Sequence, residues 1–154
     1  TPITFTTTGS SGAATFNGTA LNIPQYTALA ARNSTSGTTT SLANNVAGNI
    51  TITGRKSYML LSIETSAAAW VTVYTSSAAR TADASRTITT DPTPGSGVIA
   101  EVITTGASTQ IFSPAVFGFS DESSPSTDVQ VKVVNRSGGA TAITITMKMV
   151  QLEI

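Results

Sequence analysis

The sequence predicts an all-β protein, an antiparallel β-sandwich preceded by an extended N-terminal arm. From Asn49 onward, apolar and polar residues alternate with period two in several short segments. These segments are rich in β-branched residues and are separated by turns containing Gly, Pro and Ser, a pattern typical of antiparallel sheets. Residues 1–48 consist mainly of Thr, Ser, Ala, Gly and Asn and carry one charge, Arg32. We therefore expect an arm or long loops over residues 1–48 and a sandwich domain over residues 49–154.

The expected arm combines flexible stretches with isolated apolar residues. Residues 6–12 and 33–40 have the composition of flexible linkers. Ordering such a segment costs about 1–2 kcal/mol per residue, and scattered apolar side chains offset little of that cost. We therefore expect at most one or two short strands here, and apolar residues that contact a neighbouring subunit. The domain from Asn49 is expected to fold without the arm.

The strands of the expected sandwich follow from the alternation. The clearest segments are residues 129–133 and 143–149, and a Gly-containing loop at 135–139 joins them, which is typical of a β-hairpin. One helical turn is expected near residues 78–84. The expected strands are residues 49–53, 58–64, 70–74, 98–104, 110–113, 116–119, 129–133 and 143–149.

The last strand carries an apolar continuation that bears on assembly. Its polar positions, such as Lys148, are followed in the same parity by Val150, Leu152 and Ile154. Either a bulge near Met149 changes the register, or the outer face becomes apolar and is covered by the arm or by another subunit. We expect a homo-oligomer, specifically a trimer. The expected interface residues are Ile3, Phe5, Phe16, Leu21, Ile23, Tyr26, Val150, Leu152 and Ile154.

The composition argues against several classes of function. The chain has no His and no Cys, which excludes imidazole and thiolate catalysis, disulfides and the common zinc sites. Its formal net charge is zero, which argues against electrostatic binding to nucleic acid or to an anionic membrane surface. We expect no cofactor, no nucleic-acid partner and no membrane partner.

The remaining candidates for catalysis and metal binding are weak. A serine nucleophile would need a lysine as its base, and the alternation predicts that Lys132 and Lys148 face solvent. The carboxylates Asp121, Glu122 and Asp128 do not have the spacing of a calcium-binding loop. We therefore expect no catalytic and no metal-binding residues, and a protein that is not an enzyme.

One charged cluster, formed by Arg80, Asp83 and Arg86, has two interpretations. The guanidinium groups could contact a ligand or a subunit. Alternatively, Asp83 pairs with a neighbouring arginine and holds a loop in place. We favour the second interpretation.

The same region carries a resemblance to a known class of proteins. Residues 66–71, 78–86, 90–102 and 114–119 resemble a domain found in structural proteins of tailed bacteriophages, cyanophages especially. The resemblance extends over about residues 50–154 and includes no catalytic residue. It implies a β-sandwich of the jelly-roll type, located in the virion. The implied role is a capsid decoration (cement) protein that binds major capsid subunits, or a tail, fibre or baseplate component.

A carbohydrate-binding adhesin module is the alternative from a different class. Such a module would need an exposed aromatic platform, and the candidates are Trp70, Tyr58, Tyr74 and Tyr26. All of them except Tyr26 lie in expected strands, where a place in the core or in an interface is the expectation.

Overall fold

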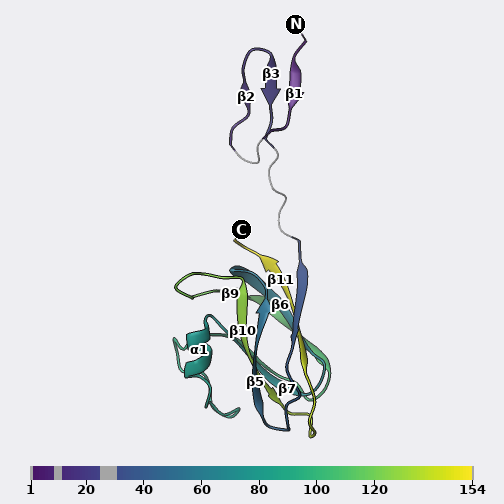
Figure 1. The fold of residues 1–154 in the computed structure, drawn as a ribbon, viewed down its shortest axis with the longest axis vertical. Coiled ribbons are helices and arrows are strands. Elements are labelled where there is room, and N and C mark those ends of the chain that lie inside the picture. Colours follow the sequence, from purple (N-terminus) through teal and green to yellow (C-terminus); the bar gives the residue numbers. More distant parts are fainter. Residues whose placement is uncertain (1, 9–11, 25–30, 154) are drawn as a thin grey trace. The chain divides into compact units, whose positions relative to one another are not determined.

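The computed structural model describes residues 2–8, 12–24 and 31–153, and the chain forms two compact units, Thr1–Ala30 and Ala31–Ile154. Both units are built from β-strands, and the larger one consists of two antiparallel sheets that pack against each other (Figure 1). The predicted all-β sandwich is therefore confirmed. The boundary between the units lies at residue 30, whereas the sequence led us to expect it at residue 48.

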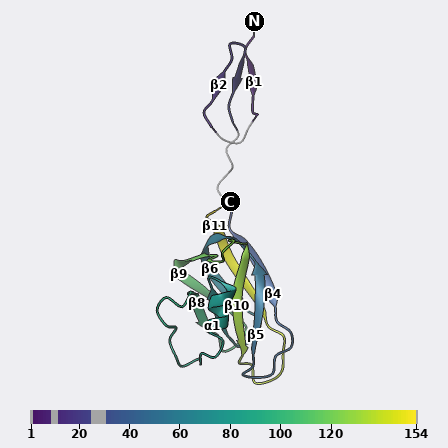
Figure 2. The ribbon, with the colours of Figure 1, turned by 60° about the vertical axis from the view of Figure 1, so that its left-hand side comes forward.

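The sandwich contains two four-stranded sheets, and every pair of neighbouring strands within them is antiparallel. The first sheet has the order β5-β10-β7-β8, and the second has the order β4-β11-β6-β9 (Figures 1 and 2). The strands are β4 (Asn33–Thr38), β5 (Ala47–Thr53), β6 (Ser57–Thr65), β7 (Ala69–Tyr74), β8 (Val98–Ile103), β9 (Ser108–Phe119), β10 (Asp128–Asn135) and β11 (Thr144–Gln151).

The connections from β4 to β11 cross between the two sheets, except for the one that joins β7 to β8. The predicted hairpin between the last two strands is therefore wrong, because β10 and β11 belong to opposite sheets. The alternation along both strands is real. It arises because their apolar sides face each other across the core and not because the strands pair.

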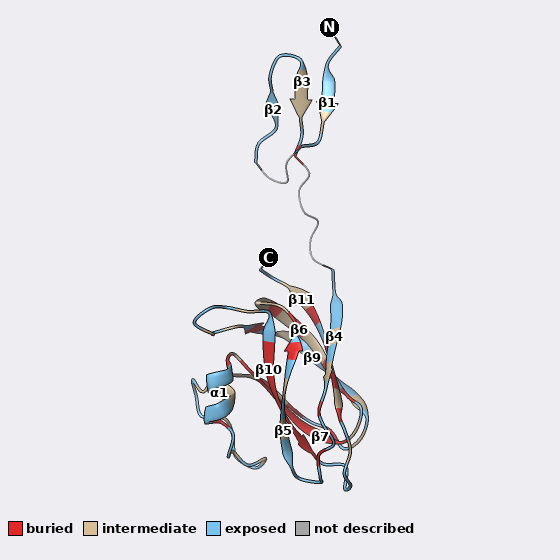
Figure 3. Ribbon diagram, in the orientation of Figure 1, coloured by how far each residue is buried: buried red, intermediate tan, exposed pale blue. Residues whose placement is uncertain are grey.

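The core lies between the sheets and is filled by alternate residues of both (Figure 3). Aliphatic and methionine side chains dominate it, and the Tyr58 ring is the largest group that it encloses. Gly118 of β9 faces the same space, and a Cβ at this position would lie 2.5 Å from the Tyr58 ring. The fully buried core residues include Ile52, Leu60, Ile63, Val71, Val73, Val131, Val133, Ile143, Ile145 and Met147.

Residues 31–48 belong to the sandwich and not to an arm. Strand β4 pairs with β11 over six residues, and Leu42 and Thr39 are buried. The inward residues of β4 are small, and the space above Gly37 is filled by Ile52, whose Cγ1 would lie 2.9 Å from a Cβ at position 37. A strand that contributes so little apolar surface of its own resembles a linker in composition, which is why its sequence was misleading.

The N-terminal unit is a small three-stranded sheet with the order β1-β3-β2. Its strands are β1 (Thr4–Thr6), β2 (Thr15–Phe16) and β3 (Ala20–Asn22), of which β1 and β3 are parallel while β2 and β3 are antiparallel. The turn between β2 and β3 is fixed by the Asn17 side chain, which accepts hydrogen bonds from the backbone N–H groups of Thr19 and Ala20.

A bulge does occur opposite the last strand, but it does not change the parity of that strand. Lys148 pairs with Ser62 and Met149 pairs with Leu60, so Leu61 of β6 is the extra residue. Strand β11 keeps its alternation, and Val150 stays on the outer face of the sheet. Of the two possibilities that the sequence left open, the structure has the apolar outer face.

One helix, α1 (Ser77–Ala82), lies outside the first sheet and contacts β7 and β10 (Figure 1). The Ser76 hydroxyl caps its N-terminus by accepting a hydrogen bond from the N–H of Ala79. All six residues of β7 are buried, because the core covers one face and the segment that contains α1 covers the other. The predicted helical turn is confirmed, and Trp70 is covered by the chain itself.

Candidate functional site

The outer face of the β4-β11-β6-β9 sheet carries a strip of apolar side chains. In the first of two adjacent rows, Val150 of β11 pairs with Met59 of β6, which pairs with Phe117 of β9. In the second row, the N–H of Leu152 donates a hydrogen bond to the carbonyl of Ser57, and Ser57 pairs with Phe119. Paired residues share one face of a sheet, so these side chains lie on one surface, with the polar Ser57 between Leu152 and Phe119. We call Met59, Phe117, Phe119, Val150 and Leu152 the apolar strip.

The two phenylalanines are the most prominent members of the apolar strip. The exposed fractions of their side chains are 70% for Phe117 and 51% for Phe119. They face outward because the alternate position, Gly118, faces inward, where the Tyr58 ring leaves no room for a side chain. Strand β9 is an edge of its sheet and contains no charged residue, although charges are a common device that keeps edge strands apart from other chains.

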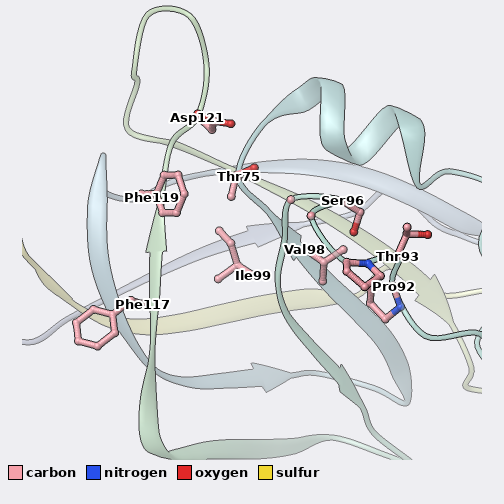
Figure 4. A pocket seen from close by; sticks show the side chains of 12 residues that line it. Thr75, Pro92, Thr93, Ser96, Val98, Ile99, Phe117, Phe119 and Asp121 are labelled. Carbon is pink, nitrogen blue, oxygen red and sulfur yellow. The ribbon is translucent and has the colours of Figure 1, made fainter.

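A surface pocket of about 570 Å³ adjoins the apolar strip at the edge of β9. Phe117 and Phe119 lie on one side of it, and Val98 and Ile99 of β8 lie on the other, together with the 92–97 loop (Figure 4). The pocket lining is mixed, because Thr75, Thr93, Ser96 and the acidic Asp121 lie among its apolar residues. Its apolar part adjoins the apolar strip at the edge of the sandwich.

A second cluster, of buried charges, lies under α1 on the outer face of the other sheet. Asp83 accepts hydrogen bonds from Tyr74 Oη at 2.7 Å and from Arg86 Nε at 2.8 Å. Lys132 Nζ lies 3.3 Å from Asp83 Oδ2 and donates to the Asp83 backbone carbonyl at 2.6 Å. Arg86 also pairs with Glu101 at 2.5 Å. Every charge in this cluster has a partner of opposite charge.

Burial and hydrogen bonding set the protonation of this cluster. Burial alone would raise the pKa of Asp83, but the hydrogen bonds from Arg86 and Tyr74 and the charge of Lys132 outweigh it and hold the pKa below its usual range. The pKa of Tyr74 is raised, mainly by burial and also by its bond to Asp83. Asp83 is thus an anion whose oxygens are occupied by donors, which suits a structural anchor.

Trp70 lies against the cationic members of this cluster. Arg86 and Lys132 lie over its ring at 5.0 Å and 4.9 Å from the centroid. Lys132 is only 2% exposed, so the prediction that it faces solvent is wrong. The interpretation of Asp83 as the partner of a neighbouring arginine is confirmed by its pair with Arg86. Arg80 instead donates to the backbone carbonyl of Ile50 at 2.8 Å.

The three acidic residues considered for metal binding occupy different places in the fold and make different contacts. Glu122 accepts a hydrogen bond from the N–H of Ser77 at 2.6 Å, at the start of α1, which lowers its pKa. Asp121 lines the pocket beside β9, and Asp128 begins β10. Among residues 2–8, 12–24 and 31–153, no group of three or more possible ligands lies close enough together to hold a metal ion. Within the same ranges, no helix has the length and apolar character needed to cross a membrane.

The nine expected interface residues fall into three groups. Ile3, Phe5, Phe16 and Ile23 are exposed on the N-terminal sheet, where Leu21 is half-buried. Val150 is half-buried and Leu152 is exposed, both in the apolar strip. Tyr26 and Ile154 lie outside the described residues.

The sequence prediction missed Met59, Phe117 and Phe119. The signal for the two phenylalanines was present in the alternation of residues 116–119, but alternation alone does not tell which of the two sides faces the core. No family model, curated protein or solved structure matches this chain.

Proposed function

We propose that this chain is a structural protein of a tailed-phage virion, specifically a capsid decoration protein that binds major capsid subunits and stabilises the head. The observation that carries the proposal is the apolar strip, which offers another protein a surface with two exposed phenylalanines. Aromatic and methionine side chains are enriched at protein interfaces. A cement protein acts by burying surface across the seams between subunits, which requires shape and apolar contact and no reacting group.

The strand order supports the proposal at the level of the fold. Counted from β4 as the first strand to β11 as the eighth, the sheets have the orders 1-8-3-6 and 2-7-4-5. We infer from this order a jelly-roll arrangement, an architecture that many viral capsid proteins use. Lectins use it as well, so the support is an analogy of fold and the surface has to carry the function.

The proposal also specifies the assembly. We place the protein in the virion as a homo-oligomer, specifically a trimer, because trimers match the local threefold axes of an icosahedral shell. It acts without a cofactor and without catalytic chemistry, and its partners are proteins and not nucleic acid or membrane.

The alternatives differ in what they require of the surface. A tail, fibre or baseplate component would use the same apolar strip with a different virion protein as its partner. An adhesin module would need an aromatic platform, and Trp70, Tyr58 and Tyr74 are all buried. The structure therefore offers the adhesin alternative no support from these three residues.

Two measurements test the proposal. Cryo-electron microscopy of the source particle should show density for this chain on the shell, and density on the tail alone would reject the decoration role. Independently, Phe117→Ser/Phe119→Ser should weaken attachment to stripped particles roughly tenfold or more, because exposed aromatics often dominate interface energy. The matched control is Val46→Ser/Ile103→Ser, which removes two apolar side chains of similar exposure outside the apolar strip. Equal attachment of both variants would contradict the proposed role of the apolar strip.

A further inference from the structure

The N-terminal sheet has two faces of opposite character. Phe5 of β1 pairs with Leu21 of β3, which pairs with Phe16 of β2, so these three side chains form one row across the sheet. Ile3 immediately precedes β1 and Ile23 immediately follows β3, each two residues from a member of this row, so they extend the same face. We call Ile3, Phe5, Phe16, Leu21 and Ile23 the apolar face of the N-terminal sheet.

The opposite face is polar and is held together by hydrogen bonds. Asn22 of β3 lies in register with Thr6 and Thr15. Its side-chain oxygen accepts from Thr6 Oγ1 at 3.2 Å and from the N–H of Thr8 at 2.8 Å, and its Nδ2 donates to the carbonyl of Thr8 at 2.9 Å. This sheet is thus amphipathic, which is typical of sheets that pack one face against a core.

The apolar face of the N-terminal sheet is largely uncovered within its own unit. The exposed fractions are 72% for Phe5 and 58% for Phe16, and Ile3 and Ile23 are also exposed. A sheet of three strands, each two or three residues long, buries little apolar surface by itself. Packing of its apolar face against another surface would therefore stabilise it.

The chemistry of the N-terminal segment favours other copies of the same chain as the source of that surface. Residues 1–31 contain no Asp, Glu, Lys, Arg or His, so the segment offers no charge pattern that would select a foreign protein. An uncharged apolar face is complementary to itself, and strongly apolar contacts characterise obligate homo-oligomers. Other copies of the chain are also present wherever the protein is made, at the concentration of the protein itself.

We propose that the N-terminal sheet is the self-association module of this protein, in which the apolar faces of identical copies pack together and enclose a shared core. This inference deepens the proposed function, because it rests on the homo-oligomer assumed there and locates its interface. The apolar strip of the sandwich then remains available for a different virion protein.

The test is the oligomeric state of the full chain by sedimentation, without particles. The wild type should sediment at micromolar concentration as a trimer, three times the chain mass of 15.7 kDa. Phe5→Ser/Phe16→Ser should sediment as a monomer with an unchanged sandwich. The matched variant, Thr4→Asp/Thr15→Asp, changes the polar face and should remain a trimer. A monomeric wild type would overturn the inference, as would a trimer that survives Phe5→Ser/Phe16→Ser or monomers in both variants.

A second readout guards against a variant that merely unfolds the small sheet. The chain has no Cys, so a single Phe5→Cys can be labelled with pyrene, and so can a single Thr4→Cys on the polar face. Excimer emission from position 5 and not from position 4 is expected if the apolar faces meet, and its absence at position 5 would overturn the inference. The proposed function and this inference can fail separately. If only the proposed function is wrong, the chain still forms trimers but does not attach to particles.

Discussion

The environment of the Lys132 side chain differs most from the one that the sequence pattern predicts. Its strand alternates in the way expected of a solvent-facing lysine, yet the side chain is enclosed by Asp83, Trp70 and Tyr74. A buried lysine is tolerated only with a counter-charge and hydrogen bonds. Asp83 supplies both, and it also fixes Arg86, so one carboxylate holds the segment that covers β7.

Replacement of this carboxylate should therefore be costly. Asp83→Asn should lower the free energy of unfolding by about 3 kcal/mol, because it leaves the buried Lys132 without its anion and Arg86 with Glu101 alone. The measurement is urea unfolding followed by the fluorescence of Trp70, the only tryptophan of the chain. Asp91→Asn, at an exposed position in the following loop, is the control and should change stability by less than about 0.5 kcal/mol.

The same substitution has a pH signature. The pKa of Asp83 in the folded protein lies below its ordinary value of 3.8, so its stabilising contribution is fully present above that pH and is lost as the pH falls through the folded pKa. The stability difference between wild type and Asp83→Asn should be constant near neutral pH and should shrink below about pH 4. A difference that stays constant down to acid unfolding would contradict this assignment.

At the scale of the elements, strand β4 defines where the sandwich begins. It completes the second sheet by pairing with β11, and its small inward residues make room for Ile50 and Ile52 of the opposite sheet. A chain that begins after this strand would leave the edge of β11 open and would expose apolar side chains.

Two truncations test this boundary. A chain that starts at residue 31 should unfold at the same urea concentration as the sandwich of the full protein. A chain that starts at residue 41 should be less stable by roughly 2–4 kcal/mol, because it loses β4 and the apolar burial that β4 provides. Urea unfolding of both chains gives the comparison, and equal midpoints would show that β4 is dispensable.

The strands of the sandwich were largely predictable, because period-two alternation follows directly from the pleat. Their partners were not. The alternation of residues 129–133 and 143–149 reports an inward face, and it is the same whether that face belongs to a hairpin or to two opposing sheets. The two segments 110–113 and 116–119 were predicted separately, and they form one long strand that is irregular opposite Leu61.

The candidate surfaces were predictable in part. Val150 and Leu152 were found from the parity of one strand, which depends on the local sequence alone. Phe117 and Phe119 were missed because their direction is set by the Tyr58 ring on a neighbouring strand. The N-terminal sheet was missed because each strand has only two or three residues, which is too short for a recognisable period.

At the scale of the whole molecule, the two proposed interfaces have the same physical basis. The apolar strip and the apolar face of the N-terminal sheet contain no ionisable side chain, and the chain has no net charge. Association through either surface should therefore depend on apolar burial and hardly on long-range electrostatics.

This basis gives a prediction about salt. Attachment of the full chain to stripped particles should change less than about threefold between roughly 50 and 500 mM NaCl, because screening acts only on charge–charge terms. Titration of labelled protein onto particles at several salt concentrations measures the effect. A steep fall in affinity with salt would indicate that charged residues, such as Arg55 or Lys56 near the end of β5, dominate the contact.

The crossing connections also decide when this protein can fold. Strand β4 is the first strand of the sandwich, yet its partner β11 is the last of the eight to leave the ribosome. Neither sheet can be completed from strands that are consecutive in the chain, and pairing between distant segments is slow because it requires closure of long loops. The second sheet can therefore be completed only after β11 has left the ribosome. Until then, the apolar segments of β6 and β7 are exposed, which makes the nascent chain a substrate for chaperones.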